Sequence, residues 1–454
     1  MKKVALSVAS VIAVTAFMSN ASAETLKDAL ASTYENNPSL LAQRANVRGV
    51  DENVPQALSG WRPQVFANGE VAAQHSNTNI TNNPGASKNT NPTSASLTVS
   101  QPLYTGGQTD ASTKSAEAAV EAARSGLLST EQTIFQSAVA AYMNVLRDAA
   151  VVDLNANNTA VLRRQLEAAN DRFEVGEITK TDVAQAEARL ADSISNQIQA
   201  EGNLRSTRAN FERIVGRAPE GLEDPLVPSD FPESEQAALA IALENHPDIK
   251  TAKFNEESSR YTIRSTSGQL LPSLSLDGSL SHGNEVSGNG TWANTAKIGA
   301  VLTVPLYQSG SVYSQVRQAR QINSQRIQEI EEAVRLIRES VVQSWEQLET
   351  ARSRIGADEE SVRANTIALE GVEQEAQVGS RTTLDVLDAE QELLSSKVNL
   401  VTSRRNQYVA LYNVLAAVGK LNARDLDLNV EYYDPASNYD RVRGKWFGTD
   451  GGLN

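Results

Sequence analysis

The stretch VGSRTTLDVLDAEQEL, residues 378–393, has a near copy far upstream, VGEITKTDVAQAEARL, at residues 175–190. Eight of the sixteen aligned positions are identical, and Gly176 and Gly379 stand at the same place in the two copies. Two similar segments in one chain indicate an internal duplication. The copies differ in charge, because only the second one carries the set Arg381, Asp385 and Asp388.

The duplication extends over most of the chain. The segments NNPSL and NHPDI align Pro38 with Pro247, and the segments QPLYTGG and VPLYQSG align Pro102 with Pro305. These markers occur in the same order in each half, so they predict two copies of one unit followed by a tail. We place the first repeat at residues 24–234, the second repeat at 235–425 and the C-terminal tail at 426–454.

Residues 1–23 are typical of a secretory signal peptide. Two lysines precede an apolar run from Val4 to Met18, and the tripeptide ASA at 21–23 provides the small residues of a cleavage site. The apolar run is shorter than the roughly 20 residues that a membrane-spanning helix needs. We therefore expect these residues to be removed from the mature chain.

The composition argues against an enzyme. The chain has no cysteine and only three histidines, which excludes disulfides and thiolate metal sites and makes a Ser-His-Asp site improbable. It also has no glycine-rich phosphate-binding loop. A formal net charge of −14 argues against nucleic-acid binding. We expect no catalytic residues, no metal and no cofactor.

Two stretches in each half alternate between apolar and polar residues. PQVFANGEVAAQ and SASLTVSQ in the first half, and their counterparts in the second, predict strand hairpins at about 62–104 and 271–305. A soluble antiparallel sheet would give the same alternation. A transmembrane barrel is favoured because the polar face is small and hydrophilic and the strands have about the length that crosses a bilayer at a tilt.

The surroundings of these strands agree with a membrane location. The segments at 75–94 and 282–294 are rich in Asn, Gly, Ser and Thr, as long exterior loops are. Aromatic residues near the strand ends could form the girdle of a membrane barrel: Trp61, Tyr104, Trp292 and Tyr307. Four strands cannot close a barrel, so the membrane interpretation requires several chains.

Long helices follow each strand hairpin. The spans from Gly107 to Gly176 and from Gly310 to Gly379 contain no proline, and a continuous helix there would be on the order of 100 Å long. We expect long helical hairpins at about 108–216 and 311–419. The returning helix of the second hairpin has an apolar residue at every seventh position, which predicts coiled-coil packing: Leu387, Leu394, Val401, Tyr408 and Leu415. A soluble adaptor with a helical hairpin would show a similar stripe, but would lack the paired strands.

Together these features resemble the TolC-like outer-membrane efflux proteins. The resemblance covers nearly the whole mature chain and is carried by the NNP and NHP repeat starts, the QPLYTGG and VPLYQSG junctions, and the VGEITKTDV and VGSRTTLDV turns. The tail YYDPASNYDRVRGKWFG is similar to the ending of members that serve type I secretion. The predicted fold class is mixed α and β, with a transmembrane β-barrel continued by a long α-helical coiled-coil barrel.

The resemblance implies an assembly and its partners. Three chains would form a homotrimer with a twelve-stranded barrel in outer-membrane lipid, and a twelve-helix tunnel would continue through the periplasm. A periplasmic adaptor (membrane fusion) protein and an inner-membrane pump of the ABC or RND type would join it at the helix tips. The tail would be periplasmic. The function implied is export of small molecules or proteins, without nucleic-acid binding.

The resemblance also assigns roles to the turns. Asp385 and Asp388 match inward-facing acidic rings that form a channel constriction, and Arg381 matches a basic residue that latches the second hairpin to Thr181 and Asp182 of the first. The aromatic gate residue of the family falls on Ala376. The turns at Gly176 and Gly379 correspond to the helix tips where an adaptor docks.

The spacing of these residues gives a partly independent argument. Asp385 and Asp388 are three residues apart and share one helical face, so a trimer would collect six carboxylates around its axis and select cations. The alternative is that Arg381 and Asp385, four residues apart, form an ordinary surface pair. At the level of function, the alternatives are an adaptor-independent outer-membrane porin and a periplasmic coiled-coil adaptor.

Overall fold

The computed structural model describes residues 24–80, 83–225, 231–285 and 290–450. The expected signal peptide, residues 1–23, lies outside the described residues. The described chain divides into two compact units. Unit 1 comprises 24–32, 138–225 and 361–405, and unit 2 comprises 33–80, 83–137, 231–285, 290–360 and 406–450.

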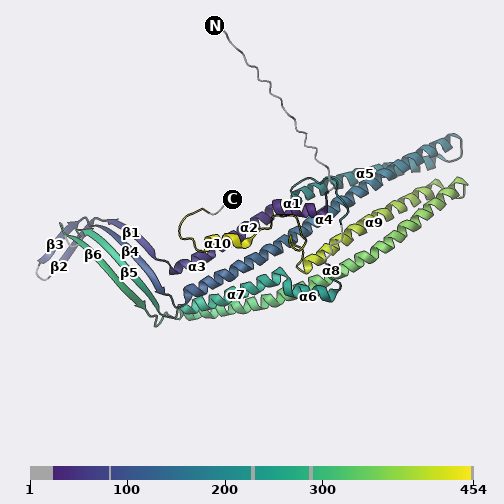
Figure 1. Ribbon diagram of the computed structural model, residues 1–454. Coiled ribbons are helices and arrows are strands. Elements are labelled where there is room, and N and C mark those ends of the chain that lie inside the picture. The colour runs from purple at the N-terminus through teal and green to yellow at the C-terminus, as the bar shows by residue number, and fades with distance from the viewer. Residues whose placement is uncertain (1–23, 81–82, 226–230, 286–289, 451–454) are drawn as a thin grey trace, which may run out of the picture. The chain divides into compact units, whose positions relative to one another are not determined.

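Unit 2 contains a four-stranded antiparallel sheet in the order β1-β4-β5-β6 (Figure 1). Its strands are β1 (Gln64–Val71), β4 (Thr93–Tyr104), β5 (Ser273–Asn284) and β6 (Trp292–Thr303). The two repeats therefore contribute one hairpin each, and β4 and β5 join them. Among the described residues, no strand pairs with the outer edge of β1 or of β6.

The prediction of an irregular exterior loop at 75–94 is wrong in one respect, because most of this segment forms a second strand hairpin. β2 (Gln74–Ile80) pairs with β3 (Asn83–Thr90), and the His75 ring lies 2.6 Å from Asn89 Oδ1. The hairpin lies beyond the last pair of the β1–β4 ladder, Val71 with Thr93, and forms a separate two-stranded sheet. Backbone pairing requires no apolar side chains, so a polar composition does not exclude strands.

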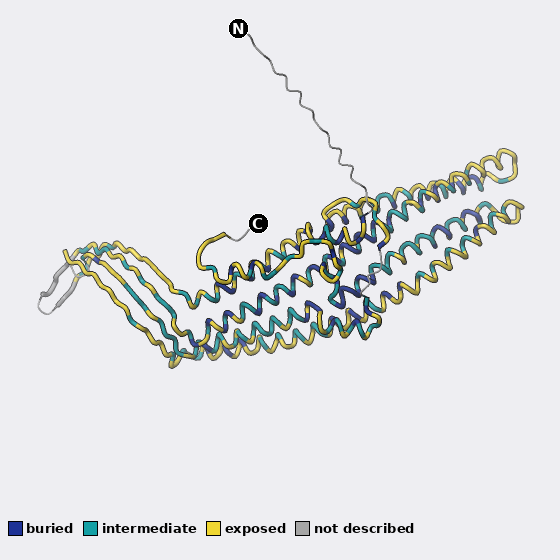
Figure 2. Tube along the Cα trace, in the orientation of Figure 1, coloured by how far each residue is buried: buried dark blue, intermediate teal, exposed yellow. Residues whose placement is uncertain are grey.

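The strand register separates the sheet into an apolar and a polar face. One row across the sheet joins Val65, Val99, Gly278 and Ile298, and the next joins Ala67, Leu97, Leu280 and Ala296. On the opposite face Ser100 donates to the Asp277 carboxylate at 2.6 Å. The apolar face is exposed in the single chain, with Ile298 77% exposed (Figure 2). Alternation in the sequence thus predicted the two faces correctly.

The helices repeat as the sequence does. The first half has α1 (Leu26–Asn36), α2 (Pro38–Asp51), α3 (Asn53–Leu58), the 3-10 turn η1 (Ser59–Trp61), α4 (Gln108–Glu174) and α5 (Lys180–Val215). The second half has α6 (Glu235–Asn245), α7 (Pro247–Gly268), α8 (Ser311–Gln377) and α9 (Thr383–Ala417), and the tail adds α10 (Pro435–Arg443). α4 and α8 each contain 67 residues.

The repeated NNP and NHP segments cap helices. Asn37 accepts hydrogen bonds from the first backbone amides of α2, and His246 accepts one from Asp248 N at the start of α7. In both helices a proline occupies the first turn, where its missing N–H costs nothing. The repeat markers found in the sequence are therefore helix starts.

Glycines allow the backbone to approach closely where the strands become helices. Gly106 follows β4 with a φ of 64°, and a Cβ built on it would lie 2.4 Å from the Gly268 carbonyl oxygen. A Cβ on Gly268 would lie 2.7 Å from the Gly106 carbonyl oxygen. The junction between β4 and α4 therefore packs directly on the end of α7, with no room for a side chain.

Each unit has its own apolar core. In unit 2, Val341 of α8 packs with Ala238 of α6 and with Val418 after α9. In unit 1, Leu387 of α9 packs against Val183 and Ala186 of α5 and residues of α4. Leu387, Leu394 and Leu415 of the predicted heptad stripe are buried. The stripe therefore faces neighbouring helices, as its spacing predicted.

The tail is held against unit 2 by buried polar contacts. The Glu131 carboxylate of α4 accepts a hydrogen bond of 2.6 Å from Ala423 N, and Tyr34 Oη accepts one of 3.0 Å from Tyr433 N. Burial raises the pKa of Glu131 to about 7, although the bond from Ala423 and the charges of Arg44 and Arg424 act in the opposite direction.

This pKa predicts a pH-dependent stability. A carboxyl group whose folded pKa is raised stabilises the fold most when protonated, so its contribution is complete below pH 4.5 and is lost as the pH rises through about 7. Glu131→Gln should remove up to about 3 kcal/mol of the pH dependence of unfolding in this window. Unfolding followed by circular dichroism at several pH values tests this, and equal pH slopes for variant and wild type would contradict it.

Candidate functional site

The two repeated turns have the same backbone structure. α4 and α8 end just before Gly176 and Gly379, whose φ angles are 80° and 78°. Glu177 N donates to Arg172 O at 2.9 Å, and Ser380 N donates to Glu375 O at 3.0 Å, which are equivalent bonds. Glycine is favoured at such a position because an L side chain is strained there. Nothing lies within 4 Å of a Cβ built on either glycine, so both turns are open to solvent.

The threonine and aspartate shared by the two copies form capping boxes. At the start of α5 the Asp182 carboxylate accepts bonds from the backbone and hydroxyl of Thr179, and Asp182 N donates back to that hydroxyl. Thr382 and Asp385 repeat the arrangement at the start of α9. Bonds from the threonine backbone and hydroxyl lower the pKa of Asp182 and of Asp385. The T-x-x-D spacing is a known capping signature and could have been recognised in the sequence.

Arg381 has a partner that sequence reasoning missed. Its Nε donates to Glu375 Oε2 at 2.8 Å, across the turn of its own hairpin, and this bond raises the pKa of Arg381. The structure therefore does not bring Arg381 to Asp182 within the described chain, nor does Arg381 form the surface ion pair considered with Asp385. Thr181 lies exposed in the first turn of α5. The repeat position equivalent to Glu375 is Arg172, so the pair belongs to the second copy alone.

Asp388 links the two hairpins. Its carboxylate forms an ion pair with Arg189 of α5, and both side chains are more than a third exposed. Arg189 aligns with Glu392 in the second copy, so the first copy carries the cation and the second carries the aspartate. The sequence signal for this pair was the charge difference between the copies, which did not indicate which residues would meet.

Residues of both turns line a recess of about 730 Å³ within unit 1. Five of its fifteen lining residues are charged, with both signs present: Arg172, Glu177, Asp182, Glu373 and Arg381. Ala376, at the position expected for an aromatic gate residue, also lines it and packs on the apolar cluster around Val386. A methyl group there leaves space that a ring would fill.

No three carboxylate or imidazole side chains in the described ranges gather as a metal site. In the same ranges no helix combines the length and the apolar character needed to cross a membrane. What the site presents is a set of fixed charges on paired helical hairpins.

Comparisons with known proteins agree on one family. The family model described as "Outer membrane efflux protein" matches residues 29–217 and 238–420. The chain is 35% identical to "Outer membrane efflux protein BepC" of Brucella suis biovar 1 over 94% of this chain and 92% of that protein. It is 29% identical to "Outer membrane protein TolC" of Vibrio cholerae serotype O1, over 90% of this chain and 93% of that one.

A more distant relative and two solved structures are also similar to this chain. The chain is 25% identical to "Alkaline protease secretion protein AprF" of Pseudomonas aeruginosa over 66% of this chain and 64% of that one. The Campylobacter jejuni CmeC outer membrane channel superposes with a TM-score of 0.76 at 17% identity, covering 92% of this chain and 89% of that chain. VceC of Vibrio cholerae gives 0.74 at 18% identity, covering 87% and 96%.

Proposed function

This chain belongs to the outer membrane efflux protein family, and on that premise we propose that three copies of it form a closed channel-tunnel for export. Members of the family are transport channels of the outer membrane, with a helical part in the periplasm, and perform no chemistry. The expected family, fold class and location are thereby confirmed. The trimer, its partners and the roles of individual residues are the proposal.

The four-stranded sheet supports the proposal of a trimer, because its edges and its apolar face are left uncovered in one chain. Both of its outer edges, on β1 and β6, are unpaired in the described chain, and its apolar face is exposed. An unpaired edge cannot face lipid, because each free N–H and C=O there costs several kcal/mol. Joining β6 of one copy to β1 of the next removes every edge once the ring closes. Three copies of four strands make the twelve-stranded ring that the family resemblance implies.

Mass measurement in detergent tests the trimer. Purified mature protein should have the mass of three chains and full β content by circular dichroism. A stable monomer with the same β content would contradict the proposal, because its edges would then be satisfied without neighbours.

We place the constriction at the second hairpin. Asp385 and Asp388 of three copies would set six carboxylates around the axis, a charge arrangement that selects cations. In the closed trimer Arg381 would latch onto Thr181 and Asp182, exchanging Glu375 for these partners. Exposure supports this exchange, since the side chains of Arg381 and Glu375 are both about half exposed and their pair is therefore weakly held.

We place the adaptor at the helix turns. Val175 and Val378, which precede the two glycines, are 73% and 80% exposed, so each turn presents an apolar side chain to solvent. These two valines would provide apolar contacts for a partner protein that docks at the turns. The proposed partners are a periplasmic adaptor and an inner-membrane pump of the ABC or RND type. A protease-secretion relative and efflux relatives support export of proteins or of small molecules, respectively.

Replacing both turn glycines tests the docking surface. Gly176→Val with Gly379→Val should abolish export, because a β-branched residue is strained at a positive φ and each turn must change shape. The trimer should survive, because no atom lies within 4 Å of the added Cβ atoms. Export and crosslinking to the adaptor are measured in cells. Unchanged export with a demonstrably altered turn would show that docking lies elsewhere.

A further inference from the structure

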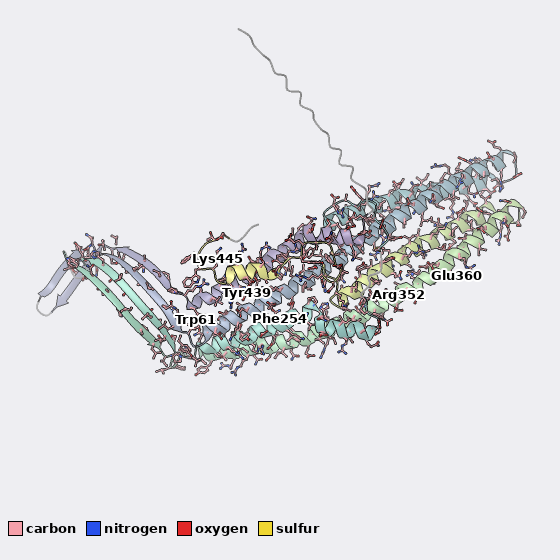
Figure 3. The ribbon with its side chains drawn as sticks, in the orientation of Figure 1. Trp61, Phe254, Arg352, Glu360, Tyr439 and Lys445 are labelled. Carbon is pink, nitrogen blue, oxygen red and sulfur yellow. The ribbon has the colours of Figure 1, made fainter. Side chains whose placement is uncertain are left out.

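The tail forms a recess beside the start of the first strand in unit 2. The recess has a volume of about 500 Å³. Its lining combines tryptophan, arginine and one carboxylate: Leu58, Trp61, Arg62, Asp440, Arg443 and Trp446. Leu58 ends α3, and Trp61 and Arg62 come from the segment that leads into β1 at Gln64. The others come from α10 and the residues that follow it. Figure 3 shows Trp61 and Lys445 in this part of the unit.

Arg62, two residues before β1, contacts the residues that follow α10 in the tail. Its Nη1 donates to the Lys445 carbonyl oxygen at 2.8 Å, and its guanidinium lies 5.0 Å from the centre of the Trp446 ring. α10 is itself fixed, because Asn438 Nδ2 donates to the buried Asp51 carboxylate at 2.7 Å. The residues that line the recess are therefore held in place by hydrogen bonds to the rest of unit 2.

The rim of the recess is aromatic and exposed. Trp446 is 57% exposed, Phe447 is 86% exposed, and their rings lie 6.5 Å apart. Trp61 is 38% exposed on the other side. In membrane proteins, exposed tryptophan next to the end of a spanning strand lies at the level of the lipid headgroups.

The charges around the recess leave one cation without a carboxylate. Arg443 pairs with Glu117 at 3.0 Å, and Lys445 pairs with Asp450 at 2.6 Å. Arg62, in contrast, contacts a carbonyl oxygen and a ring, and no carboxylate of the described residues pairs with it. The lining thus holds two arginines and one carboxylate, Asp440, and Arg62 is the arginine that is left for an anion from outside the chain.

We propose that this recess binds the headgroup of an anionic phospholipid of the membrane in which the sheet lies. The phosphate would approach Arg62, with Arg443 beside it, and Trp61, Trp446 and Phe447 would contact the glycerol and the upper acyl chains. A planar guanidinium suits a phosphate, since it offers several N–H donors in one plane. The inference depends on the outer-membrane location of the sheet and is independent of the gate and of adaptor docking.

Quenching of Trp446 fluorescence by brominated lipid tests this. The chain has four tryptophans, so Trp61→Tyr, Trp292→Phe and Trp345→Phe leave Trp446 as the only tryptophan, which is excited selectively over tyrosine. The full-length protein is reconstituted in vesicles of phosphatidylethanolamine with a minor fraction of phosphatidylglycerol. Bromine is placed on one lipid at a time. Per bromine, the phosphatidylglycerol should quench about threefold more strongly than the phosphatidylethanolamine, because the anionic lipid is enriched at the site.

Matched variants separate a site from general charge. Arg62→Gln should abolish the preference for the anionic lipid, and Arg62→Lys, which keeps the charge but not the planar guanidinium, should retain only part of it. Arg441→Gln removes an equal charge nearby, but Arg441 bonds Asn438 and does not line the recess, so the preference should persist. Equal loss in Arg62→Gln and Arg441→Gln would overturn the site. Equal quenching by both lipids in the parent protein, or no quenching by either, would also overturn it, and would leave the trimer and its export untouched.

Discussion

Replacing Asp385 and Asp388 together by alanine is expected to weaken block by multivalent cations from the periplasmic side on the order of tenfold. It should also lower the cation selectivity of the channel. Three copies would lose six carboxylates from a narrow ring, and such rings provide the field that holds a cation there. Single-channel recording in planar bilayers measures both quantities. Retained block in the double variant would show that the constriction lies elsewhere.

The structure makes this prediction sharper by giving the two aspartates different surroundings. The Asp385 carboxylate accepts a hydrogen bond from the Thr382 hydroxyl, and the Asp388 carboxylate forms an ion pair with Arg189. Arg189→Gln should therefore act in the opposite direction to the double substitution and strengthen cation block. Alanine at position 385 also removes the carboxylate of a capping box. Asp385→Asn, which is neutral but can still accept a bond from Thr382, is therefore the matched control.

The gate has a similar pair of opposed variants. Arg381→Ser should raise resting conductance, because it removes the proposed latch to Asp182. Glu375→Gln should lower it, because Arg381 loses the partner that holds it within its own hairpin. The double variant should behave like Arg381→Ser. If Arg381→Ser conducts like the wild type, the latch assignment is wrong. If Arg381→Ser raises the conductance but Glu375→Gln leaves it unchanged, the latch stands and only the role of Glu375 is excluded.

The second large effect concerns the junction between the strands and the helices. Gly106→Ala should destabilise the protein by about 3 kcal/mol or more and prevent assembly, because the new Cβ would lie 2.4 Å from the Gly268 carbonyl oxygen. Neither backbone can retreat easily, since Gly268 ends α7 and Gly106 precedes α4. Trimer yield and thermal unfolding in detergent measure the loss.

Gly107 supplies the matched control for this clash. It also has a positive φ, 76°, but nothing lies within 4 Å of a Cβ built on it. Gly107→Ala therefore carries only the backbone strain, about 1–2 kcal/mol. Trimer should still form in that variant. Equal loss in the two variants would mean that φ strain, and not close approach, determines the requirement for glycine at this junction.

The sequence predicted the features that depend on short-range periodicity. Alternation in β1 and β4 predicted which side chains share a face, because successive residues of a strand point to opposite sides. The heptad stripe from Leu387 predicted the buried side of α9. The paired prolines indicated only the duplication, and the structure shows them at helix starts. The β2–β3 hairpin was missed because its sequence, QHSNTNI and NPGASKNT, shows no alternation of apolar and polar residues.

The ion pairs could not be predicted, for a different reason. Glu375 lies six residues before Arg381, and a helix end and a turn separate them, so their contact depends on the path of the turn. The Arg189–Asp388 pair depends on how α5 packs against α9, which neither copy specifies alone. Duplication reveals equivalent positions within each hairpin, but it contains no information about the contacts between the two copies.

The unpaired edges of β1 and β6 have a genetic consequence. In the proposed trimer each subunit would complete the sheet edges of its neighbours, which are unpaired in the described chain. A variant that still enters the ring would then carry its defect into every assembly that includes it. In a cell that makes equal amounts of normal and variant chains, random mixing leaves only about one eighth of the rings entirely normal. Variants defective at the turns or the constriction, which keep the sheet intact, should thus be dominant. Variants at Gly106, which never reach the ring, should be recessive.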